Sequence, residues 1–113
     1  MNESKRTRKR KIRVIREIRE IRGRKKGIDV MKVGLIQQSC VADVEANRRK
    51  LARNIQQVAE KGAQLVVLQE LHDSLYFCQV ESVDNFDLAV PVPGPVTEFY
   101  SQLACQHHIV LVT

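Results

Sequence analysis

The sequence predicts an α/β protein whose elements follow the order β-α-β-loop-α-β over residues 31–113. Three observations support this class. Short runs of branched apolar residues recur at 33–36, 65–68 and 109–112. Segments with helical spacing of apolar residues lie between these runs, and the links are short. This arrangement is typical of parallel strands joined by right-handed crossovers, and we expect the sheet to be incomplete.

The first crossover unit carries signals at both ends of its helix. Residues 33–36 form a short apolar strand that runs into a polar loop. Asp43 is suited to cap a helix, because its carboxylate can accept hydrogen bonds from free N–H groups of the first turn. Apolar residues then recur at helical spacing over 44–59. Lys61 and Gly62 follow as a basic last turn and a left-handed terminator.

The second unit repeats this order. Leu65–Leu68 is continuously apolar, which predicts a strand covered on both faces. Gly94 and Pro95 open a second helix, since proline is favoured at the first helical position. The apolar face of this helix extends to Ala104, and residues 109–112 form the last strand.

Charge is distributed unevenly along the 113 residues. Residues 1–30 hold 13 Lys and Arg against 4 Asp and Glu, whereas residues 31–113 hold 6 against 9. We expect residues 1–30 to be a basic, disordered extension, and Met31 is an alternative start. A basic cluster can bind nucleic acid or an anionic membrane, but without interleaved aromatic residues we do not expect either contact here.

Other composition signals bound the class of protein. No apolar run reaches the roughly 20 residues of a membrane-spanning helix. Cys40, Cys78 and Cys105 are widely spaced and form no C-x-x-C pair, which is typical of reduced cytosolic thiols. We therefore expect a cytoplasmic protein. His107 and His108, next to Cys105, fit no zinc-binding spacing, and we expect no metal.

Glu70 is the main candidate for chemistry. It follows the second predicted strand by two positions, and reactive groups of α/β proteins gather at the carboxyl ends of strands. Partial desolvation there would raise the pKa of the carboxyl group and suit it to proton transfer. As an alternative, Glu70 caps the next segment or pairs with a basic residue.

Three stretches resemble the N-terminal part of the carbon–nitrogen hydrolases of the nitrilase superfamily: MKVGLIQQ, ANRRKLARNIQQVAEKGAQLVVLQELHDSLYFCQ and VPVPGPVTEFYSQLACQHHIVLVT. Within that family, LQELHDSLYFCQ is similar to the matching stretch of N-carbamoylputrescine amidases. The resemblance covers residues 31–113 and none of residues 1–30. It implies that residues 31–113 are a truncated hydrolase domain, the N-terminal part of a four-layer α-β-β-α sandwich that forms homo-oligomers when complete.

The resemblance also implies a Glu-Lys-Cys catalytic triad, of which only Glu70 has a match in this chain. Its implied role is general base toward the cysteine thiol and then toward water, while the lysine stabilises the oxyanion. Both of those residues lie downstream of the last predicted strand in family members. We do not expect Cys40 or Cys78 to replace the missing nucleophile.

The remaining implications concern the substrate. The tyrosine matching Tyr76 is expected to line the substrate site, although Tyr76 can instead pack its loop against the core. The implied full-length activity is hydrolysis of N-carbamoylputrescine to putrescine, ammonia and carbon dioxide in polyamine biosynthesis, with no metal or organic cofactor. The alternative is a catalytically inactive fragment that acts only as an interaction or structural piece.

Overall fold

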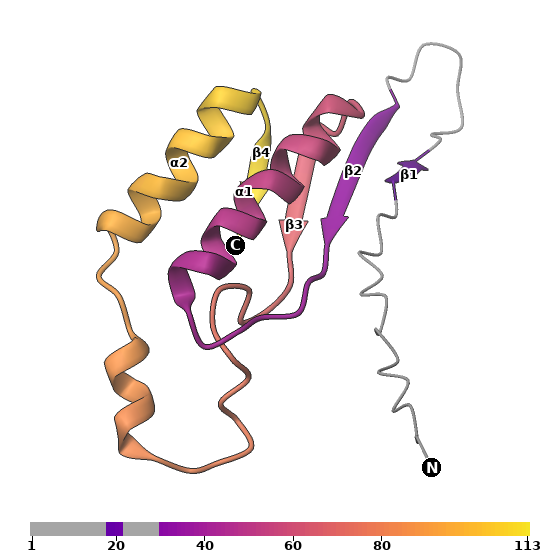
Figure 1. The fold of residues 1–113 in the computed structure, drawn as a ribbon. Helices are drawn as coiled ribbons and strands as arrows, with labels where there is room; N and C mark the ends of the chain where they lie inside the picture. Colours follow the sequence, from indigo (N-terminus) through magenta and orange to yellow (C-terminus); the bar gives the residue numbers. More distant parts are fainter. Residues whose placement is uncertain (1–17, 22–29) are drawn as a thin grey trace, which may run out of the picture.

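The computed structural model describes residues 18–21 and 30–113, and Figure 1 shows their arrangement. The elements within 30–113 occur in the predicted order, so the α/β prediction is confirmed. They are strand β2 (Met31–Ile36), helix α1 (Val44–Glu60), strand β3 (Leu65–Leu68), a 3-10 helix η1 (Val83–Leu88), helix α2 (Pro95–His107) and strand β4 (Val110–Val112). Strands β2, β3 and β4 are parallel neighbours, with β3 in the middle.

Both helices begin where the sequence predicts. The Asp43 carboxylate accepts a hydrogen bond of 3.0 Å from the backbone N–H of Ala46 and caps α1. Pro95 is the first residue of α2, after Gly94 as its N-cap. At the end of α1, Gly62 has a φ of 89°, the left-handed conformation expected of a terminator. Lys61 is the C-cap itself, so it lies just beyond the last turn in which we placed it.

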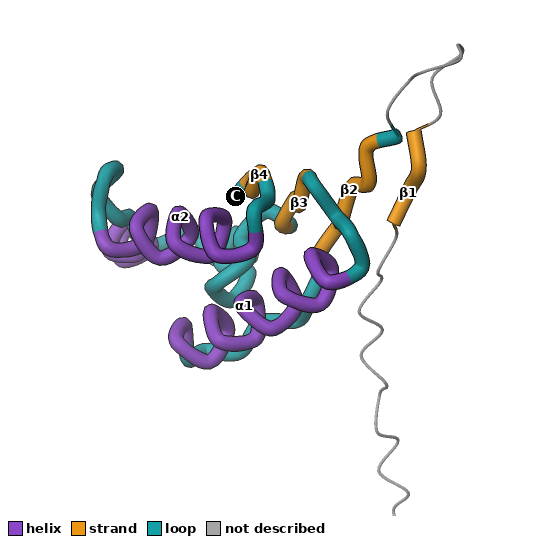
Figure 2. Tube along the Cα trace, turned by 90° about the horizontal axis from the view of Figure 1, so that it is seen from above, coloured by secondary structure: helices purple, strands orange, loops and turns teal. Residues whose placement is uncertain are grey.

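One face of the sheet is covered by the two helices (Figure 2). Leu51, Ile55 and Val58 of α1 are fully buried beside Val66 of β3. Gly34 of β2 permits this close packing, because a Cβ atom there would lie 3.1 Å from the Val58 side chain. The core therefore lies between the sheet and its helices and holds the carboxyl ends of the strands in place.

The opposite face of the sheet differs from the prediction for β3. Its alternate residues Leu65 and Val67 are only half-buried, whereas Val66 and Leu68 are buried. No helix among the described residues covers that opposite face. A continuously apolar strand is typical of a sheet covered on both faces, whereas the described residues cover only one face of β3.

Two elements were not predicted. Residues Ile18–Ile21, for which we expected disorder, form strand β1, which pairs antiparallel with β2. The outer edge of β2 presents unpaired backbone groups that a further strand can bond. Apart from Val30, the other residues of the basic extension lie outside the described residues. The helix η1 interrupts the segment that we expected to be a loop, and Ser82 caps it by accepting from the Asp84 N–H.

None of the described helices is both long enough and apolar enough to cross a lipid bilayer.

Candidate active site

The structure brings the two predicted site residues together at the carboxyl end of β3. Glu70 and Tyr76 line one small hollow of about 300 Å³. The other residues around it come from the ends of β2 and β3 and from the loop after β3: Gln38, Cys40, Gln69, Leu71, Ser74 and Leu75. Because β3 is the central parallel strand, Glu70 lies where α/β proteins place their reactive groups.

The predicted desolvation of Glu70 is wrong for the described chain. Glu70 is solvent-exposed, so its carboxyl group is not desolvated here. The described residues around this end of the sheet come from the segment after β2 and the loop after β3, and they leave the Glu70 side chain open to water. The position of Glu70 at a strand end agrees with the prediction, but its surroundings are open to water.

Tyr76 reaches over the hollow from that loop and is 64% exposed. The neighbouring Cys78, when ionised, is the main cause of a raised pKa of the Tyr76 hydroxyl, and the Glu70 carboxylate adds to it. The exposure of Tyr76 argues against the alternative in which Tyr76 packs the loop onto the core.

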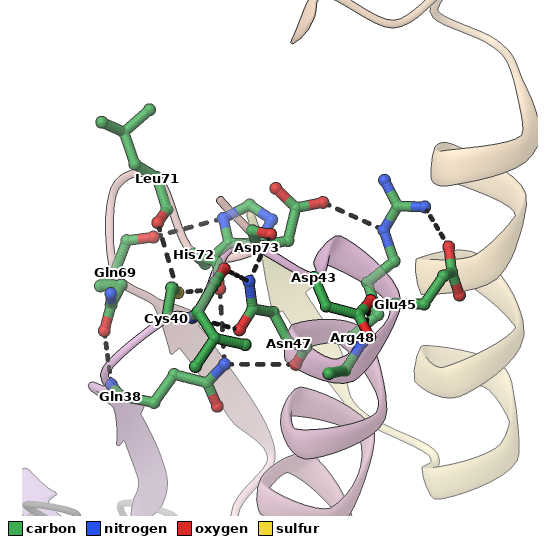
Figure 3. Close-up of polar contacts among 12 residues, drawn as sticks. Gln38, Cys40, Asp43, Glu45, Asn47, Arg48, Gln69, Leu71, His72 and Asp73 are labelled. Carbon is green, nitrogen blue, oxygen red and sulfur yellow. Dashed lines mark hydrogen bonds and ion pairs between the residues drawn. The ribbon is translucent and has the colours of Figure 1, made fainter. Parts of the chain in front are cut away.

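Buried amide side chains hold the ends of β2 and β3 together beneath the hollow (Figure 3). Gln38, which is 5% exposed, donates from its backbone N–H to the side-chain oxygen of Gln69. Its own amide group donates to the carbonyl of Asn47 at 3.2 Å and accepts from the Asn54 amide at 2.9 Å. The two strand ends are therefore bonded directly to each other, and Gln38 also attaches them to α1.

Asn47, in the first turn of α1, is the second centre of this network and is 1% exposed. Its side-chain Nδ2 donates to the carbonyls of Val41 at 2.7 Å and Asp73 at 3.0 Å, and its Oδ1 accepts from the Val41 N–H at 2.9 Å. Figure 3 shows the side chain between the loop that precedes α1 and the turn that follows Glu70. One amide thus ties both segments to the start of a helix.

Cys40 shares the small hollow with Glu70, but its geometry indicates a structural thiol. The Sγ atom donates to the carbonyl of His72 at 3.2 Å, with the carbonyl of Leu71 at 3.9 Å. Burial raises the pKa of the Cys40 thiol, which favours the protonated donor. Cys78 and Cys105 are exposed. Among the described residues, no cluster of three or more His, Cys, Asp or Glu side chains could hold a metal ion.

A second, larger hollow of about 1350 Å³ shares Leu71 and Ser74 with the first and is not lined by Glu70. Apolar residues dominate its lining, and the buried Tyr100 contributes to it. The Arg48 guanidinium acts to lower the pKa of Tyr100, but its hydrogen bonds go to Asp73 and Glu45, at 3.0 and 3.1 Å. The Tyr100 hydroxyl has no hydrogen-bond partner in the described part of the chain.

The family model described as "Carbon-nitrogen hydrolase" matches residues 32–113, which include all three parallel strands, both α-helices and Glu70. The chain belongs to the carbon–nitrogen hydrolase family. This match confirms the resemblance that the sequence indicates.

Curated relatives of this carbon–nitrogen hydrolase chain carry two names. A citrullinase of Francisella tularensis is 35% identical over 82 residues, which cover 72% of this chain and 29% of the relative. N-carbamoylputrescine amidases of Solanum lycopersicum and Oryza sativa are 34% and 35% identical, covering 60% and 72% of this chain and 23% and 27% of the relatives. The chain thus spans less than a third of these relatives. No solved structure matches it.

Sequence reasoning did not single out the amide network of this hydrolase chain. A usable signal exists, because Asn47 and Asn54 are spaced four residues before and three residues after Leu51. That spacing places both asparagines on the buried face of α1. A buried asparagine on an apolar face must have hydrogen-bond partners, so the pattern could have indicated a polar network at this end of the helix.

Proposed function

We propose that this chain supplies the general base, Glu70, of an amidohydrolase that removes ammonia from a terminal carbamoyl group. The observation that carries the proposal is the position of Glu70. It lies at the carboxyl end of the central strand of a carbon–nitrogen hydrolase domain, in one hollow with Tyr76. The implied triad also requires a lysine and a cysteine. We propose that both lie outside residues 32–113.

In the proposed reaction, Glu70 first accepts the proton of the cysteine thiol, and the thiolate attacks the carbamoyl carbon. The C–N bond to the terminal amino group then breaks, and ammonia leaves with the proton that Glu70 held. Glu70 next takes a proton from water, whose hydroxide attacks the carbonyl carbon of the S-carbamoyl (thiocarbamate) intermediate. The C–S bond breaks, and Glu70 returns its proton to the cysteine sulfur. The resulting carbamic acid decomposes to the free amine and carbon dioxide, so all atoms balance.

The proposed substrate is N-carbamoylputrescine. The names of the relatives favour a carbamoylated amine, because citrulline and N-carbamoylputrescine both end in the same –NH–CO–NH2 group. They differ at the far end, where citrulline carries a carboxylate and an amino group. The exposed Tyr76 side chain is proposed to line the site near the carbamoyl group, because it lines the same small hollow as Glu70.

The test uses the rice amidase, of which 83 residues match this chain. Residues 32–113 replace the matching segment, which is 27% of the rice enzyme, so the rice portion provides the rest of the enzyme. We expect this chimaeric enzyme to release ammonia from N-carbamoylputrescine faster than from citrulline. The chain of residues 1–113 alone, which matches only the triad glutamate, should release none.

A folded chimaera with the oligomeric state of the rice enzyme but no ammonia release would contradict the proposed function. Faster release of ammonia from citrulline would support the proposed hydrolysis of a carbamoyl group but would contradict N-carbamoylputrescine as the substrate.

A further inference from the structure

The turn after β3, residues 69–73, is bound by side chains on both sides of Glu70. Before Glu70, the side-chain oxygen of Gln69 accepts from the backbone N–H of Gln38. After it, the carbonyl of His72 accepts from the Gln38 amide at 3.5 Å and the carbonyl of Asp73 accepts from Asn47 at 3.0 Å. The backbone that carries Glu70 is thus held from two other segments.

This turn contains a strained residue directly after Glu70. Leu71 has a φ of 52°, in the left-handed region that residues of the L configuration other than glycine rarely adopt. Such a conformation persists only where surrounding contacts maintain it. Loss of the contacts to residues 69, 72 and 73 would allow Leu71 to relax, and the direction of the Glu70 side chain would change with it.

Gln38 and Asn47 are suited to maintain the turn because both are nearly inaccessible to water, at 5% and 1% exposed. Gln38 follows β2 by two residues, and Asn47 lies in α1 four residues before the fully buried Leu51. The core fixes both elements, so the two amides transfer the position of the sheet and helix to the turn.

We infer that Gln38 and Asn47 are positioning residues that set the direction of the Glu70 carboxylate through the strained turn at Leu71. The inference rests on the proposed function, in which Glu70 is the general base. Neither amide is required to touch the substrate.

The first test is hydrogen exchange, followed by mass spectrometry, on the 113-residue chain. Asn47→Asp and Gln38→Glu keep the size of each side chain but replace a donor nitrogen by oxygen, which faces backbone carbonyls. We expect exchange in residues 69–75 to accelerate about tenfold, with exchange at 51–60 of α1 unchanged. Asn85→Asp is the matched control, because Asn85 also donates to a carbonyl, that of Val80, outside the network.

A second pair of variants tests whether the hydrogen bond to the Gln69 side chain, and not a general loss of stability, controls exchange in the turn. Gln69→Glu retains an oxygen that can accept from Gln38 N–H, so exchange in residues 69–75 should stay near that of the natural chain. Gln69→Met removes the acceptor and should accelerate exchange there. Equal exchange in all variants, or acceleration spread evenly through α1 and β3, would overturn the inference.

The chimaeric enzyme adds a catalytic readout. With Asn47→Asp, we expect kcat for carbamoyl hydrolysis to fall roughly tenfold to a hundredfold with KM little changed, because a misdirected base acts on the transition state. An unchanged kcat would reject the positioning role while leaving the proposed function intact. If the unsubstituted chimaera is inactive, the proposed function fails, and the exchange data still decide whether the two amides hold the turn.

Discussion

At Tyr100 the protein buries a hydroxyl group that has no hydrogen-bond partner among the described residues. The ring itself is well packed, with edge-to-face contacts to His72 and Phe99 at centroid distances of 5.3 and 5.1 Å. Burial raises the pKa of Tyr100, the Asp73 carboxylate adds to the rise, and Arg48 opposes it. The apolar ring therefore stabilises the fold, while the hydroxyl adds a desolvation cost.

Replacement of Tyr100 by phenylalanine should increase the free energy of unfolding by about 1 kcal/mol at neutral pH, because it removes an unsatisfied polar group. Urea denaturation followed by circular dichroism measures this change. Tyr76→Phe, at an exposed position, should leave the free energy of unfolding unchanged. Destabilisation by Tyr100→Phe would contradict the absence of a partner for the hydroxyl.

We also expect the free energy of unfolding to depend on pH through Tyr100. The pKa of Tyr100 is higher in the folded state than its ordinary value of 10.0, so the folded state binds the proton more tightly. This contribution to stability is complete below about pH 10 and is lost as the pH rises toward the folded-state pKa. The phenylalanine variant should lack this part of the alkaline loss.

At the scale of elements, local signals predicted most of the fold. The Asp43 cap, the Gly62 terminator and Pro95 depend on their immediate neighbours, so they could be recognised in the sequence. Strand β1 could not, because it depends on the free edge of β2. The open surroundings of Glu70 also depend on which other segments cover the strand ends, and local sequence carries no such information.

The amide network was missed for a related reason. The bond between Gln38 and Gln69 joins residues 31 positions apart, and that between Gln38 and Asn54 joins residues 16 positions apart. Helical spacing indicates which residues of α1 are buried, but it does not identify partners on other elements. Glu70 could be predicted because the apolar run of its strand visibly ends two residues before it. The hydrogen bonds that hold its turn come from three segments that are distant in the sequence.

The close contact between α1 and β2 at Gly34 limits the size of the side chain at that position. A methyl group on Gly34 would lie 3.1 Å from Val58 and 3.3 Å from Ala63. Gly34→Val should therefore lower the free energy of unfolding by about 1–3 kcal/mol through overpacking, as measured by urea denaturation. Leu35→Ile, on the uncovered face of the same strand, should change it by less than about 0.5 kcal/mol.

Compensation tests the cause of that loss. Gly34→Ala should cost less in a Val58→Ala background, because the Cγ2 methyl group of Val58, 3.1 Å from the added Cβ, is gone, while the Cβ atom at position 58 remains. Equal costs in both backgrounds would contradict an explanation by overpacking.

For the whole molecule, the uncovered face of the sheet is the main feature. Figure 2 shows both helices on the other side of the sheet. The register places six apolar residues of the three parallel strands on the uncovered face: Val33, Leu35, Leu65, Val67, Val110 and Val112. An apolar surface of this kind marks an interaction site or promotes association. We propose that the second sheet of the family's α-β-β-α sandwich covers this face in a complete hydrolase.

The 113-residue chain alone should therefore self-associate. Val110 is 63% exposed on this face, and Val110→Lys should lower the average mass measured by light scattering after size-exclusion chromatography. Val92→Lys adds the same charge at a loop position that is 79% exposed, and it should leave the mass unchanged. A natural chain that stays monomeric at all concentrations would contradict this reading of the sheet.

The central claim is that Glu70 of this chain acts as the general base of a carbon–nitrogen hydrolase. The most direct measurement is the initial rate of ammonia release from N-carbamoylputrescine by the chimaeric enzyme with Glu70→Gln, compared with the exposed control Glu81→Gln. We predict that Glu70→Gln lowers kcat by at least about a thousandfold, with the fold and oligomeric state retained, and that Glu81→Gln leaves it unchanged. A Glu70→Gln enzyme that retains most of its activity would contradict the claim.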